Sequence, residues 1–157
     1  MAHNNIERVI NYYQQGDYAA TVFRIQLSVE QLQKAVLLFL GIQFRKTHEP
    51  SRIIDAIIYD SDFELEEELL EILKKMSFFA KKIEKEQTAT RYGIKKNGMI
   101  IPPEDFYDKS KTIEFIDVLI EIISIIIFIF IDVPDLKQES NRLKQNMKKI
   151  EDLVKNE

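Results

Sequence analysis

The sequence contains no cysteine and only two histidines, and these absences exclude several classes of protein. A chain without cysteine has no disulfide scaffold, thiolate zinc site, iron–sulfur cluster or cysteine nucleophile. One of the two histidines, His3, lies in the first few residues, where chains often fray. We therefore expect no metal site built from several histidines and no cofactor.

Glycine and proline are also scarce, with four of each in 157 residues, and half of each lie between residues 93 and 103. An all-β chain needs more turn residues than this, so the scarcity favours helices. Apolar residues make up 45% of the chain and charged residues 31%, which is a globular balance. The net charge of −4 gives no overall attraction to nucleic acid, although a local basic patch can still form.

Long apolar runs are missing as well. The N-terminus, MAHNNIERV, lacks a basic segment followed by an apolar run, so we expect no signal peptide and a cytoplasmic protein. A membrane span needs about 20 mainly apolar residues. The most apolar stretch lies in a helix expected over residues 112–131, and between Glu121 and Asp132 it supplies only ten. This pattern favours a core or subunit-interface helix and no membrane association.

Apolar residues that recur every three or four positions predict four helices before residue 86. Residues 86–110 follow no such period, so we expect a long loop there, of the kind that is usually functional or disordered. The signals that we expect to cap or stop the four helices are, in chain order, Asn5, Gly16, Asp17, Gly41, Thr47 and the pair Ser61 with Glu64.

These elements predict an all-α fold, a helical bundle with a long loop before its last core helix. We assign residues 1–134 to the bundle. Residues 135–157 repeat apolar side chains at heptad spacing, at Leu136, Leu143 and Ile150. Two readings of this tail stay open: a terminal helix packed on its own domain, or an arm that pairs across a dimer.

Catalytic motifs are mostly absent: the chain has no phosphate-binding loop, dinucleotide fingerprint, H-E-x-x-H or G-x-S-x-G. Two carboxylates one turn apart on an apolar helix, Asp117 and Glu121, should border a groove or pair with a cation, for which Arg91 or Lys34 is available. His48 is the one histidine within the helical region and can carry a proton near neutral pH. A capping role for it is favoured over catalysis.

Several short motifs then occur in a recognisable order. Glu30 and Lys34 lie four residues apart in GDYAATVFRIQLSVEQLQKAVLLFLGI, a Thr-His-acid step follows at residues 47–49, and Arg91 with Tyr92 precedes the last apolar helix. Over residues 6–131 this order resembles the HEPN domains of archaea and bacteria, in particular their small stand-alone branch. The chain departs from that pattern at Pro50, in place of an apolar residue, and at Gly93, in place of a proline.

The resemblance implies an up-and-down antiparallel bundle of four to six helices that forms a homodimer. It also implies a module that binds a nucleotide or partners a minimal nucleotidyltransferase in a toxin–antitoxin-like pair. RNase members of the superfamily carry Arg followed after four to six residues by His, whereas only two residues separate Arg45 from His48. We therefore lean towards a protein that is not an enzyme, with no catalytic and no metal residue assigned.

Each ligand-binding candidate has a positive charge, a hydrogen-bonding group or a ring on which a base can stack. The Lys and Arg residues among them are suited to binding phosphate. The candidates are Lys34, Thr47, His48, Arg91, Tyr92, Lys95 and Lys96, supported by Glu30, Arg45, Asp117 and Glu121. Arg91 can instead pair with a buried carboxylate and anchor its loop. Two other functions stay open: a degenerate ribonuclease acting on RNA as a dimer, through Arg45 and His48, and a purely structural oligomerisation protein.

Overall fold

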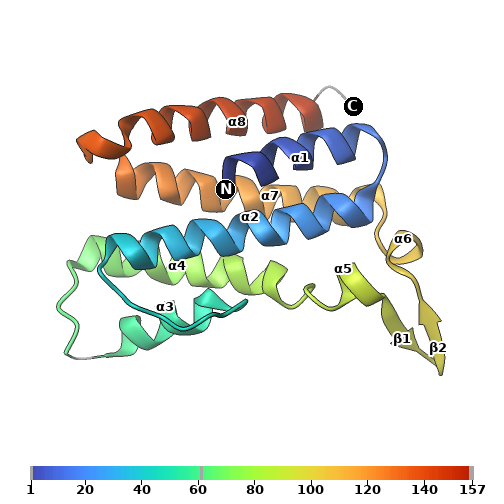
Figure 1. Ribbon diagram of the computed structural model, residues 1–157, viewed down its shortest axis with the longest axis horizontal. Helices are drawn as coiled ribbons and strands as arrows, with labels where there is room; N and C mark the ends of the chain where they lie inside the picture. Colours follow the sequence, from blue (N-terminus) through green and yellow to red (C-terminus); the bar gives the residue numbers. More distant parts are fainter. Residues whose placement is uncertain (1, 61, 156–157) are drawn as a thin grey trace.

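The structure, a computed structural model, describes residues 2–60 and 62–155 and is all-α apart from one short hairpin (Figure 1). Its long helices alternate in direction along the chain, as expected for an up-and-down bundle. In chain order they are α1 (Ala2–Gln14), α2 (Tyr18–Phe39), α4 (Glu67–Glu84), α7 (Lys109–Phe130) and α8 (Lys137–Lys155), and the shorter α3 (Pro50–Tyr59) lies against α4.

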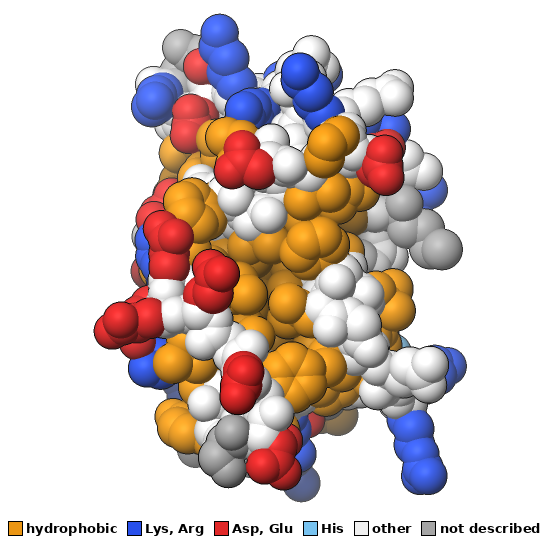
Figure 2. Space-filling model, turned by 90° about the vertical axis from the view of Figure 1, so that its left-hand side faces the viewer, with side chains coloured by type: hydrophobic (Ala, Val, Ile, Leu, Met, Phe, Trp, Pro, Cys, Tyr) orange, Lys and Arg blue, Asp and Glu red, His pale blue; other side chains and the backbone are white. Residues whose placement is uncertain are grey.

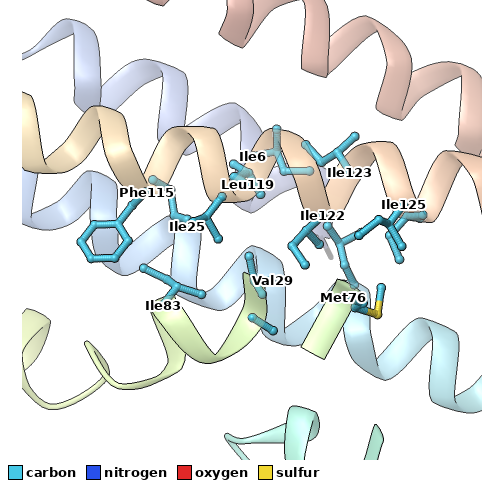
Figure 3. Packing of buried hydrophobic residues seen from close by; sticks show 14 of the residues in the cluster. Ile6, Ile25, Val29, Met76, Ile83, Phe115, Leu119, Ile122, Ile123 and Ile125 are labelled. Atoms are coloured by element: carbon cyan, nitrogen blue, oxygen red, sulfur yellow. The ribbon is translucent and has the colours of Figure 1, made fainter. Parts of the chain in front are cut away.

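Helix α7 lies at the centre of the bundle, between α2, α4 and α8. Its residues Leu119 and Ile122 are fully buried, and they meet Val29 of α2 and Met76 of α4 in a continuous apolar core (Figure 3). A helix that is apolar on nearly all sides must be covered on nearly all sides. The expectation of a central helix over residues 112–131 is therefore confirmed, and no helix of the described ranges is long and apolar enough to cross a membrane.

Local signals predicted some helix ends correctly. Asp17 caps α2 by accepting a hydrogen bond from the Ala20 N–H at 3.0 Å, and the glycines that end α1 and α2, Gly16 and Gly41, both adopt positive φ. Pro50 occupies the first turn of α3.

Other expected caps were wrong. Helix α1 begins at Ala2, because the side chain of Asn5 is buried and bonded to Gln31 and Arg24 rather than capping. Glu49 precedes α3 directly, and Thr47 accepts from the Glu49 N–H. Helix α4 begins at Glu67, after the expected pair, of which Ser61 lies outside the described residues.

The long loop expected over residues 86–110 is also wrong, because this segment is folded. It contains α5 (Ala89–Tyr92), a hairpin of β1 (Ile94–Lys96) and β2 (Met99–Ile101), and α6 (Pro103–Phe106). The two-residue turn, Asn97 and Gly98, has positive φ at both positions, as tight hairpins require. Gly93 precedes β1 with φ +72°, and a Cβ there would lie 2.0 Å from the Ile101 carbonyl oxygen. This position therefore needs glycine.

The C-terminal helix packs on its own bundle. After a 3₁₀ turn, η1 (Pro134–Leu136), helix α8 buries Leu143 and Ile150 against the rest of the chain and contacts α1 and α7. Polar contacts join the same elements, since His3 Nε2 lies 2.7 Å from Glu139 Oε2. Within this chain, α8 is thus a terminal helix packed on its own domain, and pairing of residues 135–157 across a dimer stays a prediction.

Candidate functional site

Four of the predicted residues meet where α2 passes the start of α3. Lys34 Nζ lies 2.5 Å from Glu30 Oε1, one helical turn away, and His48 Nδ1 lies 3.2 Å from Glu30 Oε2. Glu30 is only 7% exposed, whereas the side chains of Lys34 and His48 are 24% and 44% exposed. Thr47 is the residue before His48. A buried carboxylate thus holds two nitrogen groups towards the surface, and we name these four residues the Glu30 cluster.

A second buried carboxylate fixes the neighbouring helix. Glu84, at the end of α4, is 7% exposed and accepts hydrogen bonds from the Ser51 N–H at 3.2 Å and from Gln33 Nε2 at 2.9 Å. The Ser51 hydroxyl also donates to it. No Lys or Arg of the described ranges pairs with Glu84, so these donors and the positive end of α3 stabilise its charge. This contact holds the start of α3, and with it His48, beside α2.

Sequence reasoning missed Gln33, Ser51 and Glu84. The one available signal was that Gln33 lies three residues after Glu30 and so faces nearly the same side of α2. Glu84 stands in a run of Lys and Glu, which reads as a solvated surface.

A pocket of about 510 Å³ borders the Glu30 cluster between α2, α7 and α8. Glu30 and Lys34 are among its lining residues, and His3, Gln31 and Glu139 are its other polar ones. The rest of its lining is mostly apolar and includes Ala35, Leu38 and Phe130. A mostly apolar pocket with a few polar groups is the usual form of a small-molecule site.

The other predicted binding residues lie at the opposite end of α2, on α5 and the hairpin (Figure 1). The Arg91 guanidinium lies 5.3 Å from the centre of the Phe23 ring. Phe23 precedes Lys34 by eleven residues, which is about 16 Å along a helix. Tyr92, Lys95 and Lys96 are exposed near Arg91. The structure therefore brings Lys34, Thr47 and His48 together and keeps the hairpin residues apart from them.

The two supporting carboxylates of α7, Asp117 and Glu121, do border a groove, of about 670 Å³, between α4 and α7. The expectation that Arg91 or Lys34 pairs with them was wrong: Lys75 of α4 lies 2.8 Å from Glu121, because α4 is the helix that covers this side of α7. Burial raises the pKa of Asp117, and the charges of Glu114 and Glu121 raise it further.

The remaining supporting cation, Arg45, is exposed and bonds to no other side chain in the described part of the chain. No three His, Asp or Glu residues within residues 2–60 and 62–155 gather as metal ligands would.

One end of the bundle is conspicuously apolar. The last turns of α2 and α7 expose Leu38, Phe39, Phe128 and Ile131, which we name the apolar end. Figure 2 shows hydrophobic side chains gathered across this end, with acidic side chains along one edge. Isolated exposed apolar residues are ordinary, but a contiguous group of this kind marks an interaction surface in many proteins.

Comparison with known proteins gives one family match: a family model described as HEPN domain matches residues 1–129 of the 157. The matched range includes the Glu30 cluster, Glu84, the hairpin and nearly all of α7. No curated protein and no solved structure matches the chain.

Proposed function

The chain belongs to the HEPN domain family, and on this premise we propose that it is a non-catalytic module that binds a nucleotide at the Glu30 cluster. The observation that carries the proposal is the arrangement of one buried carboxylate beneath two outward-facing nitrogen groups. Glu30 orients Lys34 and His48 and is itself covered by them. A ligand approaching from solvent meets the cation first.

Phosphate oxygens suit this surface. Lys34 supplies a point charge, and the Nε2 of His48, whose Nδ1 lies on Glu30, can donate a hydrogen bond. The Thr47 oxygen accepts from the Glu49 N–H, which leaves its hydroxyl proton available to donate. The apolar pocket beyond Lys34 has room for the base and ribose, beside Ala35 and Phe130.

The hairpin fits a protein partner better than a small ligand. Arg91, Lys95 and Lys96 lie near two exposed apolar side chains, Met99 and Ile100. Apolar side chains combined with arginine are typical of protein interfaces. We assign this surface to a small nucleotidyltransferase that would accept or present the bound nucleotide, as one half of a toxin–antitoxin-like pair.

HEPN domains commonly dimerise, and the apolar end is the surface that favours a homodimer here. A two-fold contact would cover Leu38, Phe39, Phe128 and Ile131 on both copies. Sedimentation should give a dimer at micromolar concentration, and Phe128→Glu should give a monomer with an unchanged helical content. A parent protein that sediments as a monomer would contradict this part of the proposal.

Nucleotide binding is tested by titration calorimetry with a panel of mono-, di- and triphosphates. Lys34→Ala should weaken binding about tenfold or more, since a hydrogen bond to a charged group contributes about 1.5–3 kcal/mol. Lys148→Ala, an exposed lysine of α8, is the matched control and should change nothing. If no nucleotide binds, or if Lys34→Ala and Lys148→Ala have the same nucleotide affinity, the assignment of the nucleotide site to the Glu30 cluster is wrong.

The partner surface is tested separately, by capture from the native host. Arg91→Ala should reduce capture of a nucleotidyltransferase while leaving the melting temperature nearly unchanged, because exposed side chains usually shift stability by no more than about 0.5 kcal/mol. A collapse of the melting temperature would instead make Arg91 a structural anchor on Phe23.

A second candidate function, RNA cleavage, is favoured by one contact. A carboxylate on Nδ1 of a histidine leaves Nε2 free for acid–base work, and Glu30 and His48 have this arrangement. We expect no cleavage, since Arg45 makes no contact with His48. Incubation of structured and single-stranded RNA with the parent and with His48→Ala decides the matter: cleavage that the substitution abolishes would replace the first proposal.

A further inference from the structure

A groove between α3 and α4 carries positive charge that the Glu30 cluster does not use. Helices α3 and α4 lie side by side (Figure 1). The groove that they line has a volume of about 420 Å³, and we name it the α3–α4 groove. Among the described residues, Asp55 is the one carboxylate in its lining, against four lysines: Lys74, Lys81 and Lys82 of α4, and Lys85 directly after it. In a chain with a net charge of −4, this is a local concentration of cations.

Two of the four lysines are available to a ligand. Lys74 lies 2.7 Å from Glu71, and Lys81 lies 2.5 Å from Asp55. Lys82 and Lys85 form no ion pair with any residue of the described ranges. They lie three residues apart at the C-terminal end of α4, Lys85 being its cap, so their ammonium groups can reach neighbouring phosphates of one strand.

Two exposed aromatic rings line the same groove. Tyr59, at the end of α3, is 84% exposed, and Phe78, in the middle of α4, is 59% exposed. The Lys82 ammonium lies 4.5 Å from the centre of the Phe78 ring, so cation and ring already form one unit. Aromatic rings interleaved with lysines are what a single strand needs, because bases stack on the rings while the lysines follow the backbone.

Charge on the far side of α4 confines such a ligand to this groove. Lys82 and Lys85 also border the groove between α4 and α7, where Glu114, Asp117 and Glu121 gather. These carboxylates repel a phosphate backbone. On the α3 side, Asp55 is the one carboxylate that the described part of the chain contributes to the lining, and it is already paired with Lys81.

We propose that the α3–α4 groove binds single-stranded nucleic acid, with phosphates on Lys82 and Lys85 and bases stacked on Tyr59 and Phe78. The strand is recognised by its charge and its exposed bases, without sequence readout. This site shares no residue with the Glu30 cluster. The proposal is therefore tested independently of nucleotide binding at that cluster.

The test uses fluorescence anisotropy with labelled 12-nucleotide oligo(U) and oligo(dT) on the full chain at low salt. Tyr59→Ala and Phe78→Ala should each weaken binding by about fivefold or more. Lys82→Ala and Lys85→Ala should each reduce the slope of log affinity against log salt by about 0.7. Lys148→Ala is the matched control and should leave both quantities unchanged. Binding of either oligonucleotide with this pattern supports the proposal, and the two probes show whether the groove prefers RNA or DNA.

Inorganic polyphosphate, a polyanion without bases, separates stacking from charge. Its binding should fall in Lys82→Ala and Lys85→Ala but not in Tyr59→Ala. The proposal is overturned if neither oligonucleotide binds, or if the aromatic variants bind oligonucleotides as the parent does. It is also overturned if Lys34→Ala abolishes oligonucleotide binding while Tyr59→Ala has no effect, since the strand would then occupy the Glu30 cluster. If calorimetry shows no mononucleotide binding at the Glu30 cluster, the proposal for the α3–α4 groove is not affected.

Discussion

Replacing Glu84 with alanine tests how the start of α3 is held in place. Its carboxylate is 7% exposed and accepts from the Ser51 N–H, the Ser51 hydroxyl and Gln33 Nε2. The hydroxyl can turn to another acceptor, but the backbone N–H and the amide cannot easily do so. Glu84→Ala therefore leaves two buried donors unsatisfied.

Each buried donor without a partner costs about 1–3 kcal/mol, so Glu84→Ala should lower the free energy of unfolding by about 2–6 kcal/mol. This is a large part of the 5–15 kcal/mol that holds an ordinary domain together. Glu84→Gln keeps the shape and one acceptor, so its loss should be smaller. The control is Glu71→Ala, which breaks an exposed ion pair with Lys74 and should cost no more than about 1 kcal/mol.

Urea unfolding followed by far-ultraviolet circular dichroism measures these differences. A double-mutant cycle with Ser51→Ala should show that the two substitutions are not additive, because both remove the same contact. If Glu84→Ala costs less than about 1 kcal/mol, or if the effects of the two substitutions simply add, Glu84 does not hold α3 in the way described.

Three further substitutions test other parts of the structure. Gly93→Ala should lower the melting temperature, because a Cβ cannot fit 2.0 Å from the Ile101 carbonyl oxygen at φ +72°. Tyr107→Phe should cost about 1.5–3 kcal/mol in urea unfolding, since the Tyr107 hydroxyl donates to Glu86 at 2.8 Å, and burial, then that contact, raises its pKa. The pKa of Asp117 is raised by folding, so its contribution to stability is present in acid and is lost as the pH rises through the folded pKa. Asp117→Asn should therefore stabilise the protein at neutral pH, by about 0.5 kcal/mol or less for an exposed side chain, and not near pH 3.

The long helices could be predicted because their signal is local. Apolar residues of α2 recur every three or four positions, and α7 is apolar on nearly all sides, so both patterns are visible within one segment. Asp17 and Gly16 act on their own helix ends and were predicted for the same reason.

The hairpin was missed because its strands have three residues each, too few to show a period of two. The Asn97–Gly98 pair was a usable local signal for a tight turn. The contacts of Glu84 could not be predicted from spacing, because its partners are far away in the sequence. Ser51 precedes it by 33 positions, and Gln33 precedes it by 51 positions. Such contacts depend on how the helices pack.

The candidate site was partly predictable for the same reason. Glu30 and Lys34 lie one turn apart on one helix, so their contact follows from the sequence. The approach of His48 to Glu30 depends on the path of residues 41–49 and on the anchored start of α3. The distance between Lys34 and Arg91 depends on which end of α2 lies beside α5 and the hairpin. No motif in the sequence predicts that end.

Nuclear magnetic resonance of the two histidine rings tests the nucleotide site most directly. The chain has only His3 and His48, of which His48 lies on the Glu30 carboxylate and His3 lines the adjoining pocket beside Glu139. On addition of a nucleoside triphosphate, the ring signals of His48 should shift, Lys34→Ala should abolish the shift, and the control Lys148→Ala should leave it unchanged. If the His48 signals do not move at a nucleotide concentration that saturates binding, the Glu30 cluster is not the nucleotide site.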